Sequence, residues 1–174
     1  MENFDVSIMI GSDSDYPIIE ETIAILDKFG IKYALTVTSA HRTPERTEEW
    51  IKFSEEKGAK VFIVGAGAAA HLAGVVAAKT ILPVIAVPIS ATSLNGVDAL
   101  YSTVQMPGGI PVACMAIGKA GARNAGIFAV QILAINNPEL KMKLNNFKVE
   151  MKKSVEEKAK RLTIKNPNII AEFD

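Results

Sequence analysis

Short apolar runs that suit β-strands alternate with helix-like segments along most of this chain. The strand-like runs are rich in Val and Ile, and the helix-like segments carry apolar residues at three- and four-residue spacing. This alternation predicts an α/β fold, a three-layer, doubly wound parallel sheet with helices on both faces. The expected strands are residues 6–10, 31–37, 61–64, 84–87 and 112–117, and the expected helices run from residue 16 to about 30, then 43–57, 71–80, 96–104 and 121–135.

The last of these helices and the tail after it differ in character. Residues 121–135 are apolar almost all round, so we expect that helix to be buried. Asn137, Pro138 and Glu139 have the chemistry of a helix start, and a charged amphipathic pattern follows. We therefore expect one domain over 1–174, with a core at 5–136 and a C-terminal amphipathic helix at 138–164. That helix can pack on its own sheet or reach over a neighbouring subunit.

The bulk properties narrow the class of partner and compartment. The chain has 19 basic and 19 acidic side chains, so no global field attracts nucleic acid or an anionic membrane. No basic leader precedes an apolar run at the start, and the most apolar stretch is broken by Lys79 and Pro83. The single Cys114 lies in an apolar run and suits a reducing cytoplasm as buried filler. Abundant small apolar residues favour a homo-oligomer over a monomer.

Residues 39–44 place a titratable ring, a permanent cation and a helix start together. They follow the second expected strand, and open α/β sheets bind ligands at such strand ends. Thr43 is a good helix N-cap and Pro44 suits the first helical position. Arg42 beside free helix N–H groups suits an anion such as phosphate, and His41 suits proton transfer near neutral pH. The alternative is a surface turn with an incidental His and Arg.

Two other strand-end loops join this one. The turn 11–15 can hold a phosphate and bring Asp15 to ribose hydroxyls, or its Asp13 or Asp15 can simply cap the next helix. The segment 65–71 has side chains no larger than methyl before His71, which suits either a flat ring or tight strand–helix packing. His71 itself faces the pocket or its own helix.

A fourth segment, 105–111, combines two prolines with two glycines and suggests a shaped loop over a pocket or at a subunit contact. Metal binding and a Ser-His-Asp hydrolase are poorly supported. The two histidines and one cysteine match no ligand spacing, and no Gly-x-Ser-x-Gly elbow occurs.

Five motifs occur in a specific order over roughly residues 5–136, and together they resemble one family. The chain resembles the 5-(carboxyamino)imidazole ribonucleotide mutases of purine biosynthesis. The motifs are Gly11-Ser12-x-Ser14-Asp15, the stretch from Ser39 to Pro44, Gly65-Ala66-Gly67 with Ala70-His71-Leu72, the stretch from Gln105 to Val112, and that from Ala116 to Ala122.

The resemblance implies a flavodoxin-like fold, a homo-octamer with active sites at subunit contacts, a small ribonucleotide substrate, and neither metal nor organic cofactor. The implied reaction moves a carboxylate from the exocyclic nitrogen to ring carbon 4. By motif position, Ser12, Ser39 and Arg42 hold the phosphate and Asp15 the ribose. The residues implied around the imidazole and carboxylate are Ala40, His41, Ala66, Gly67, Ala69, His71 and Leu72. We expect His41 to be the single acid–base group, over a sealed pocket.

Two alternatives remain at this point. Related carboxylases fix free carbon dioxide, but they typically carry Lys where this chain has Arg42 and a Gly-Arg-Ser-Asn-like segment at 65–70. A noncatalytic flavodoxin-like nucleotide-binding module gives His41 no task. The chain also departs from the mutases, which usually have Gly at Ala68 and Pro at Ala73. We expect changed affinity rather than lost chemistry, with a cost at Ala68 only if that residue needs a positive φ.

Overall fold

The computed structural model describes residues 2–165, which divide into two compact units between Leu133 and Ala134. The first unit is built on a five-stranded, all-parallel sheet in the order β2-β1-β3-β4-β5. The predicted doubly wound, flavodoxin-like fold is confirmed. The strands are β1 (Val6–Ile10), β2 (Tyr33–Val37), β3 (Val61–Gly67), β4 (Val84–Ile89) and β5 (Ala113–Cys114).

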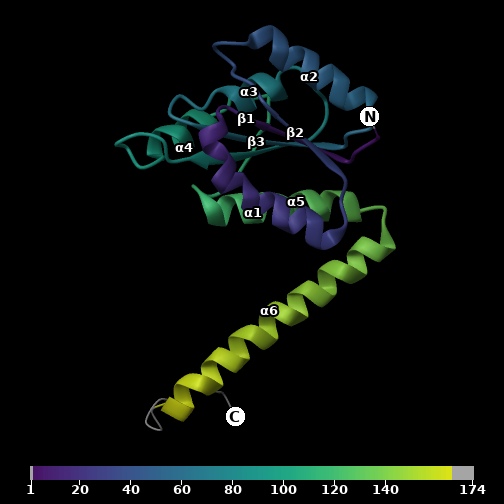
Figure 1. The fold of residues 1–174 in the computed structure, drawn as a ribbon, viewed down its shortest axis with the longest axis vertical. Helices are drawn as coiled ribbons and strands as arrows, with labels where there is room; N and C mark the ends of the chain where they lie inside the picture. Colours follow the sequence, from purple (N-terminus) through teal and green to yellow (C-terminus); the bar gives the residue numbers. More distant parts are fainter. Residues whose placement is uncertain (1, 166–174) are drawn as a thin grey trace. The chain divides into compact units, whose positions relative to one another are not determined.

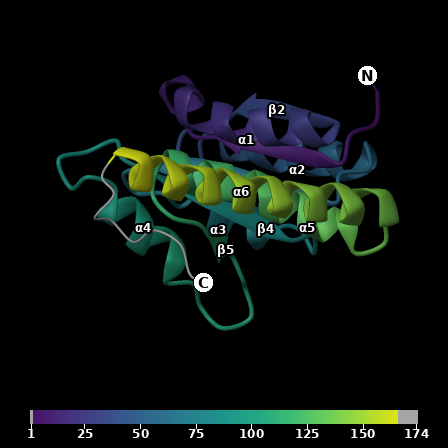
Figure 2. The same cartoon turned by 90° about the horizontal axis from the view of Figure 1, so that it is seen from below.

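Helices cover both faces of this sheet. On one face lie α1 (Tyr16–Phe29) and α5 (Lys119–Ala134); on the other lie α2 (Pro44–Glu56), α3 (Leu72–Ala77) and α4 (Val97–Val104) (Figure 1). Seen from below, β2 with α1 and α2 lies at one edge of the unit, and α4 with β5 lies at the other (Figure 2). The sheet is thus enclosed: β1 and β4 are buried along their whole length, and β3 is buried except at its last residue.

Close packing joins α1 to α5. The Thr22 hydroxyl donates a hydrogen bond of 2.7 Å to the Ala122 carbonyl. A Cβ at Gly126 lies only 2.9 Å from the Ile25 Cβ, so this contact requires glycine. The expectation that this helix is buried holds for one face only, where Val130 and most of its Ala and Gly residues are buried, while Arg123 and Phe128 are exposed. Small residues made the helix look more apolar than the face it buries.

Several element bounds also differ from the sequence-based expectation. The second strand begins at Tyr33 rather than Ile31, because Gly30 takes a left-handed φ of 71° and the Ile31 N–H then bonds the Leu26 carbonyl as part of the helix cap. The third strand continues to Gly67 because it pairs with β4 along its whole length. Helix α3 stops at Ala77, and β5 keeps only two paired residues.

The second unit contains the expected C-terminal helix, α6 (Pro138–Lys165). The Asn137 side chain accepts a hydrogen bond of 3.1 Å from the Leu140 N–H at its start. Lys143 lies 2.8 Å from Glu139 one turn earlier, and this ammonium lowers the pKa of the Glu139 carboxyl. No helix within residues 2–165 is long and apolar enough to cross a membrane.

Candidate active site

The strand order creates a crevice at the carboxyl edge of the sheet. The chain passes from β1 to β2 on one side of β1, and then returns to β3 on its other side, so the loops after these strands diverge at a topological switch point. A pocket of about 350 Å³ opens there. It is lined by Gly11, Ser12, Ser14, Asp15, Ser39, Ala40, His41, Arg42, Ala66, Gly67, Ala68, Ala69, Leu72 and Ala91.

The loop after β1 holds its own shape with its own polar groups. The Ser12 hydroxyl accepts a hydrogen bond of 3.3 Å from the Ser14 N–H, and the Asp15 carboxylate accepts one of 3.0 Å from the Ser12 N–H. This capping box begins a short 3₁₀ turn, Asp13–Asp15. Asp15 stands before α1 but makes no side-chain cap bond to that helix. Its carboxylate is therefore fixed within the pocket lining by the loop that carries it.

The Asp15 side chain is 4% exposed, which sets its electrostatics. Burial raises the pKa of this carboxyl from its ordinary value, and hydrogen bonds from the backbone N–H groups of Ser12 and Gly11 partly oppose that rise. The carboxylate thus has less water around it and directed donors in its place.

The loop after β2 presents Ser39, Ala40, His41 and Arg42 to the pocket. The Ser39 hydroxyl accepts a hydrogen bond of 3.2 Å from the Arg42 N–H, and the Ser39 carbonyl accepts one of 3.0 Å from the Thr43 N–H. Thr43 stands at the N-cap of α2 with Pro44 after it, as predicted, but its hydroxyl does not cap the helix. Instead it accepts a hydrogen bond from the Ser39 N–H at 3.0 Å, which closes the loop.

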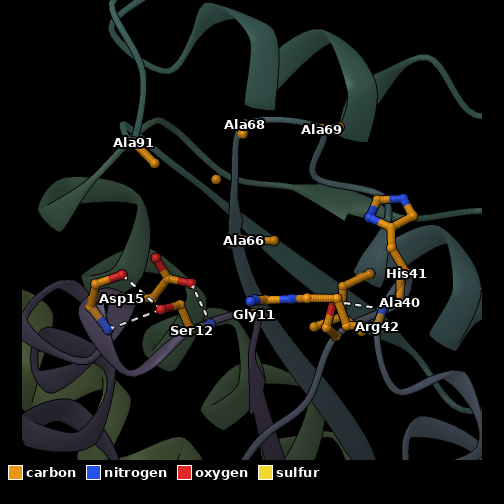
Figure 3. Close-up of a pocket in the computed structure, with 14 residues that line it drawn as sticks. Gly11, Ser12, Asp15, Ala40, His41, Arg42, Ala66, Ala68, Ala69 and Ala91 are labelled. Atoms are coloured by element: carbon orange, nitrogen blue, oxygen red, sulfur yellow. Dashed lines mark hydrogen bonds between the residues drawn. The ribbon is translucent and has the colours of Figure 1, made fainter.

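Figure 3 shows how the two loops face one another. Ser12 and Asp15 lie on one side of the pocket, while Ala40, His41 and Arg42 lie on the other, with Ala66 between them (Figure 3). The pocket therefore has polar groups on two facing walls and a methyl group on the wall that joins them.

The two histidines of the chain meet at the edge of this pocket. The His41 Nε2 and His71 Nδ1 atoms lie 2.8 Å apart, and the rings meet edge to face with centroids 4.9 Å apart. His71 stands at the start of α3 without capping it, so of its two expected orientations it takes the one toward the site. It does not line the pocket directly and reaches it through His41.

The loop after β3 supplies a wall of small side chains. A Cβ at Gly67 lies 2.6 Å from the Ala91 Cβ and 3.0 Å from the Ile89 carbonyl oxygen, so only glycine fits there. Ala68 has a φ of 54°, in the left-handed region where a side chain is strained. The positive φ that makes alanine costly at this position is therefore present.

All the predicted site residues except His71 line this one pocket, although they come from three separate loops. Gly11, Ser14, Ala68 and Ala91 line it as well and were not in the predicted set. The first three lie inside the motifs that carried the prediction. Ala91 follows β4, so the end of the fourth strand was the signal that the sequence reasoning did not use.

Two expectations about this site involve a neighbouring subunit as well as the described chain. No residue of 105–111, all of which are described, lines the pocket, because that segment connects α4 to β5 at the edge of the sheet. The pocket is also not sealed by residues 2–165, since Ser14, His41 and Arg42 are exposed to solvent. Cys114 is half-buried and lies outside the pocket, and burial raises the pKa of its thiol.

Known proteins share this sequence and fold. The family model described as AIR carboxylase matches residues 5–154. The N5-carboxyaminoimidazole ribonucleotide mutases of Pyrococcus horikoshii and Thermotoga maritima are 55% and 54% identical, each over 90% of this chain and 88% and 91% of their own. The crystal structure of Treponema denticola PurE is 29% identical and superposes with a TM-score of 0.81 over 90% of this chain and 97% of its own. The chain therefore belongs to the AIR carboxylase family, among its N5-carboxyaminoimidazole ribonucleotide mutases.

Proposed function

We propose that this protein catalyses the isomerisation of 5-(carboxyamino)imidazole ribonucleotide to 5-amino-1-(5-phosphoribosyl)imidazole-4-carboxylate, a step of purine biosynthesis. The observation that carries this proposal is one pocket lined by a guanidinium and several hydroxyls, a wall of small residues and an imidazole. The names of the relatives support the same activity.

The phosphate and ribose bind at the polar end of the pocket, which we define as Ser12, Asp15, Ser39 and Arg42. Arg42 supplies the positive charge for the phosphate, and the hydroxyls of Ser12 and Ser39 supply neutral hydrogen bonds. The buried Asp15 carboxylate accepts hydrogen bonds from the ribose hydroxyls. Holding the nucleotide by these remote groups makes the reaction effectively intramolecular, which removes much of its entropic barrier.

The imidazole base and the migrating carboxylate lie at the histidine end, which we define as His41, His71 and the wall 66–69. His41 as imidazolium protonates the exocyclic nitrogen, and the bond from that nitrogen to the carboxylate carbon breaks. Carbon dioxide and aminoimidazole ribonucleotide form in the pocket. Ring carbon 4 then attacks the carbon dioxide, and neutral His41 removes the proton from that carbon. One base suffices because the proton given in the first half is recovered in the second.

The wall of small residues provides space for the carbon dioxide. Ala66, Gly67 and Ala69 leave an apolar space beside the substrate ring, and Ala40 and Leu72 extend it. A molecule of carbon dioxide held there stays next to ring carbon 4 only if water and escape are limited. Because one chain leaves the pocket open, closure has to come from another part of the assembly.

We propose a homo-octamer in which neighbouring subunits close each pocket. Exposed apolar side chains on and before α4 support an interface, among them Leu94 and Tyr101. Helix α6 also exposes apolar side chains along its length, including Val149 and Val155. We also propose a cytoplasmic location, because the chain has a single cysteine, which fits a reducing compartment.

The competing activity is carboxylation of aminoimidazole ribonucleotide by free carbon dioxide, and one experiment separates the two. The purified protein is incubated with each nucleotide, with and without bicarbonate, and the 4-carboxylated product is measured. We expect rapid product formation from the carboxyamino nucleotide without bicarbonate. Product formed only from aminoimidazole ribonucleotide with bicarbonate would establish the carboxylase instead.

A further inference from the structure

Two neighbouring hydroxyls on α4 form hydrogen bonds with the backbone of Ala70, the residue that follows the pocket wall 66–69. The Ser102 Oγ accepts a hydrogen bond of 3.0 Å from the Ala70 N–H. The Thr103 Oγ1 donates one of 3.3 Å to the Ala70 carbonyl. Both polar groups of the Ala70 backbone are thus bonded to side chains more than 30 residues away in the chain. Neither Ser102 nor Thr103 lines the pocket.

The side chains of residues 66–70 cannot stabilise the conformation of this segment. Residues 66–70 carry at most a methyl group, and Ala68 has the strained positive φ. The Ala70 N–H also bonds the Ala68 carbonyl at 2.9 Å, and the His71 N–H bonds the Ala69 carbonyl at 2.8 Å. These bonds span two residues and form consecutive tight turns. The strained conformation of Ala68 at the start of these turns persists only where surrounding structure fixes it.

The environment of the two hydroxyls makes them suited to that task. The Ser102 hydroxyl donates within its own helix to the Asp98 carbonyl at 2.8 Å, which leaves its lone pairs for the Ala70 N–H. Thr103 is 3% exposed and Ala70 is 2% exposed, so the bond between them lies out of water. Loss of the Thr103 hydroxyl therefore leaves the Ala70 carbonyl buried without this bond, which is costly.

We propose that Ser102 and Thr103 are positioning residues for the mutase reaction, an inference that rests on the proposed function. They fix Ala70, and the residues on either side of it are the ones the reaction uses. Ala69 lines the pocket on one side, and on the other His71 meets His41 at 2.8 Å. Helix α4 therefore sets the orientation of the histidine pair and the width of the wall without touching the substrate.

The first test compares the kinetics of matched variants. Thr103→Val removes the hydroxyl at nearly constant volume, while Thr103→Ser keeps it; Ser102→Ala removes the second hydroxyl. The control is Ser54→Ala, which deletes a buried helix hydroxyl that bonds the Trp50 carbonyl and the Ser7 hydroxyl and does not line the pocket. We expect kcat to fall on the order of 10-fold in Thr103→Val and Ser102→Ala with KM little changed, since small displacements of reacting groups are costly. Thr103→Ser and Ser54→Ala keep the parental kcat.

The second readout does not depend on activity. The chain contains two histidines, so protein labelled with ¹³C in its histidine rings gives two sets of ring signals. We expect both sets to move in Ser102→Ala and Thr103→Val and to stay in place in Ser54→Ala. Unchanged ring signals and kcat in the first two variants would overturn the proposal, and so would equal changes in Ser54→Ala. If the parent protein had no mutase activity, the proposed function would be refuted. The histidine ring signals would still test whether Ser102 and Thr103 position the histidine pair.

Discussion

The two ends of the pocket are built in different ways. At the polar end, the loop after β1 is stabilised by the side chains it presents: Ser12, Ser14 and Asp15 bond to one another and to their own backbone. At the histidine end, the loop after β3 presents only methyl groups and hydrogens before His71. Its shape is held by Ser102 and Thr103, which lie on a different helix.

This difference follows from what each end has to do. A phosphate and a ribose need donors and acceptors, and the same groups can stabilise the empty loop. A carbon dioxide molecule and a flat ring need space, and a loop that provides space has no side chains left to hold it. Support must then come from outside the loop, and the functions of binding and chemistry become separable by mutation.

The largest expected effect is at the histidine end. His41→Asn removes the proposed acid–base group while keeping a polar side chain. We expect kcat to fall by about 10²–10⁴-fold, the usual contribution of general acid–base catalysis, with nucleotide binding retained. Steady-state kinetics and calorimetric binding of the nucleotide check the two parts. Near-normal turnover would remove His41 from the mechanism.

The next largest effect is at the polar end and has the opposite signature. Arg42→Ala removes the cation that we propose binds the phosphate, and a hydrogen bond to a charged group contributes about 1.5–3 kcal/mol. We expect KM to rise by roughly 10- to 150-fold with a smaller change in kcat. Arg42→Lys, which keeps the charge but not the forked geometry, should lie between. A pure kcat defect in Arg42→Ala would contradict the phosphate role and the division of the pocket.

Asp15→Asn separates stability from binding within the polar end. Burial raises the pKa of Asp15, so the folded state favours its protonated form. Its contribution to stability is therefore fully present below the ordinary pKa of 3.8 and is lost as pH rises through the raised value. We expect Asp15→Asn to match or exceed the parental Tm at pH 7, with the difference vanishing near pH 3. KM should rise by about 10-fold, because the amide lacks the negative charge and one of the two acceptor oxygens that we propose bind the ribose.

Melting curves across this pH range measure the stability part. A Tm deficit for Asp15→Asn that is larger at pH 7 than at pH 3 would show that the ionised carboxylate stabilises the loop. Unchanged KM would show that Asp15 does not contact the ribose.

The smallest expected effect is at Ala68. A left-handed conformation costs a non-glycine residue about 1–2 kcal/mol. Glycine relieves this strain but makes the unfolded chain more flexible, which costs the folded state about 0.4–1 kcal/mol. We expect Ala68→Gly to stabilise the protein by about 1 kcal/mol or less and to change nucleotide affinity a few-fold without loss of kcat. Denaturant unfolding measures the first and calorimetry the second. A destabilised Ala68→Gly variant would mean that the strain is absent.

Much of the fold and site is predictable because the signals are local. The alternation of apolar runs gives the parallel sheet, and β1 has the predicted bounds. The residues after β1 and β2 reach the pocket because parallel strands bring their carboxyl ends to one edge. The conformational freedom of glycine also predicts that alanine at position 68 is unfavourable if that residue has a positive φ, which it has.

The rest depends on contacts between distant residues. The apolar content of α5 does not reveal that only one of its faces is buried, because burial depends on what packs against the helix. The run 112–117 looks like a full strand, yet β5 keeps only the residues that β4 pairs with. The hydrogen bonds from Ser102 and Thr103 to the Ala70 backbone join residues more than 30 positions apart, which no local sequence pattern predicts.

The central claim is that the carboxylate moves within one pocket, between two atoms of one nucleotide. The most direct test starts from carboxyamino nucleotide with ¹³C in its carboxylate, in buffer with excess unlabelled bicarbonate, and measures ¹³C in the 4-carboxylate of the product at early turnover. The account predicts that the label is retained in the product. Product carrying the unlabelled carbon of the buffer would contradict it.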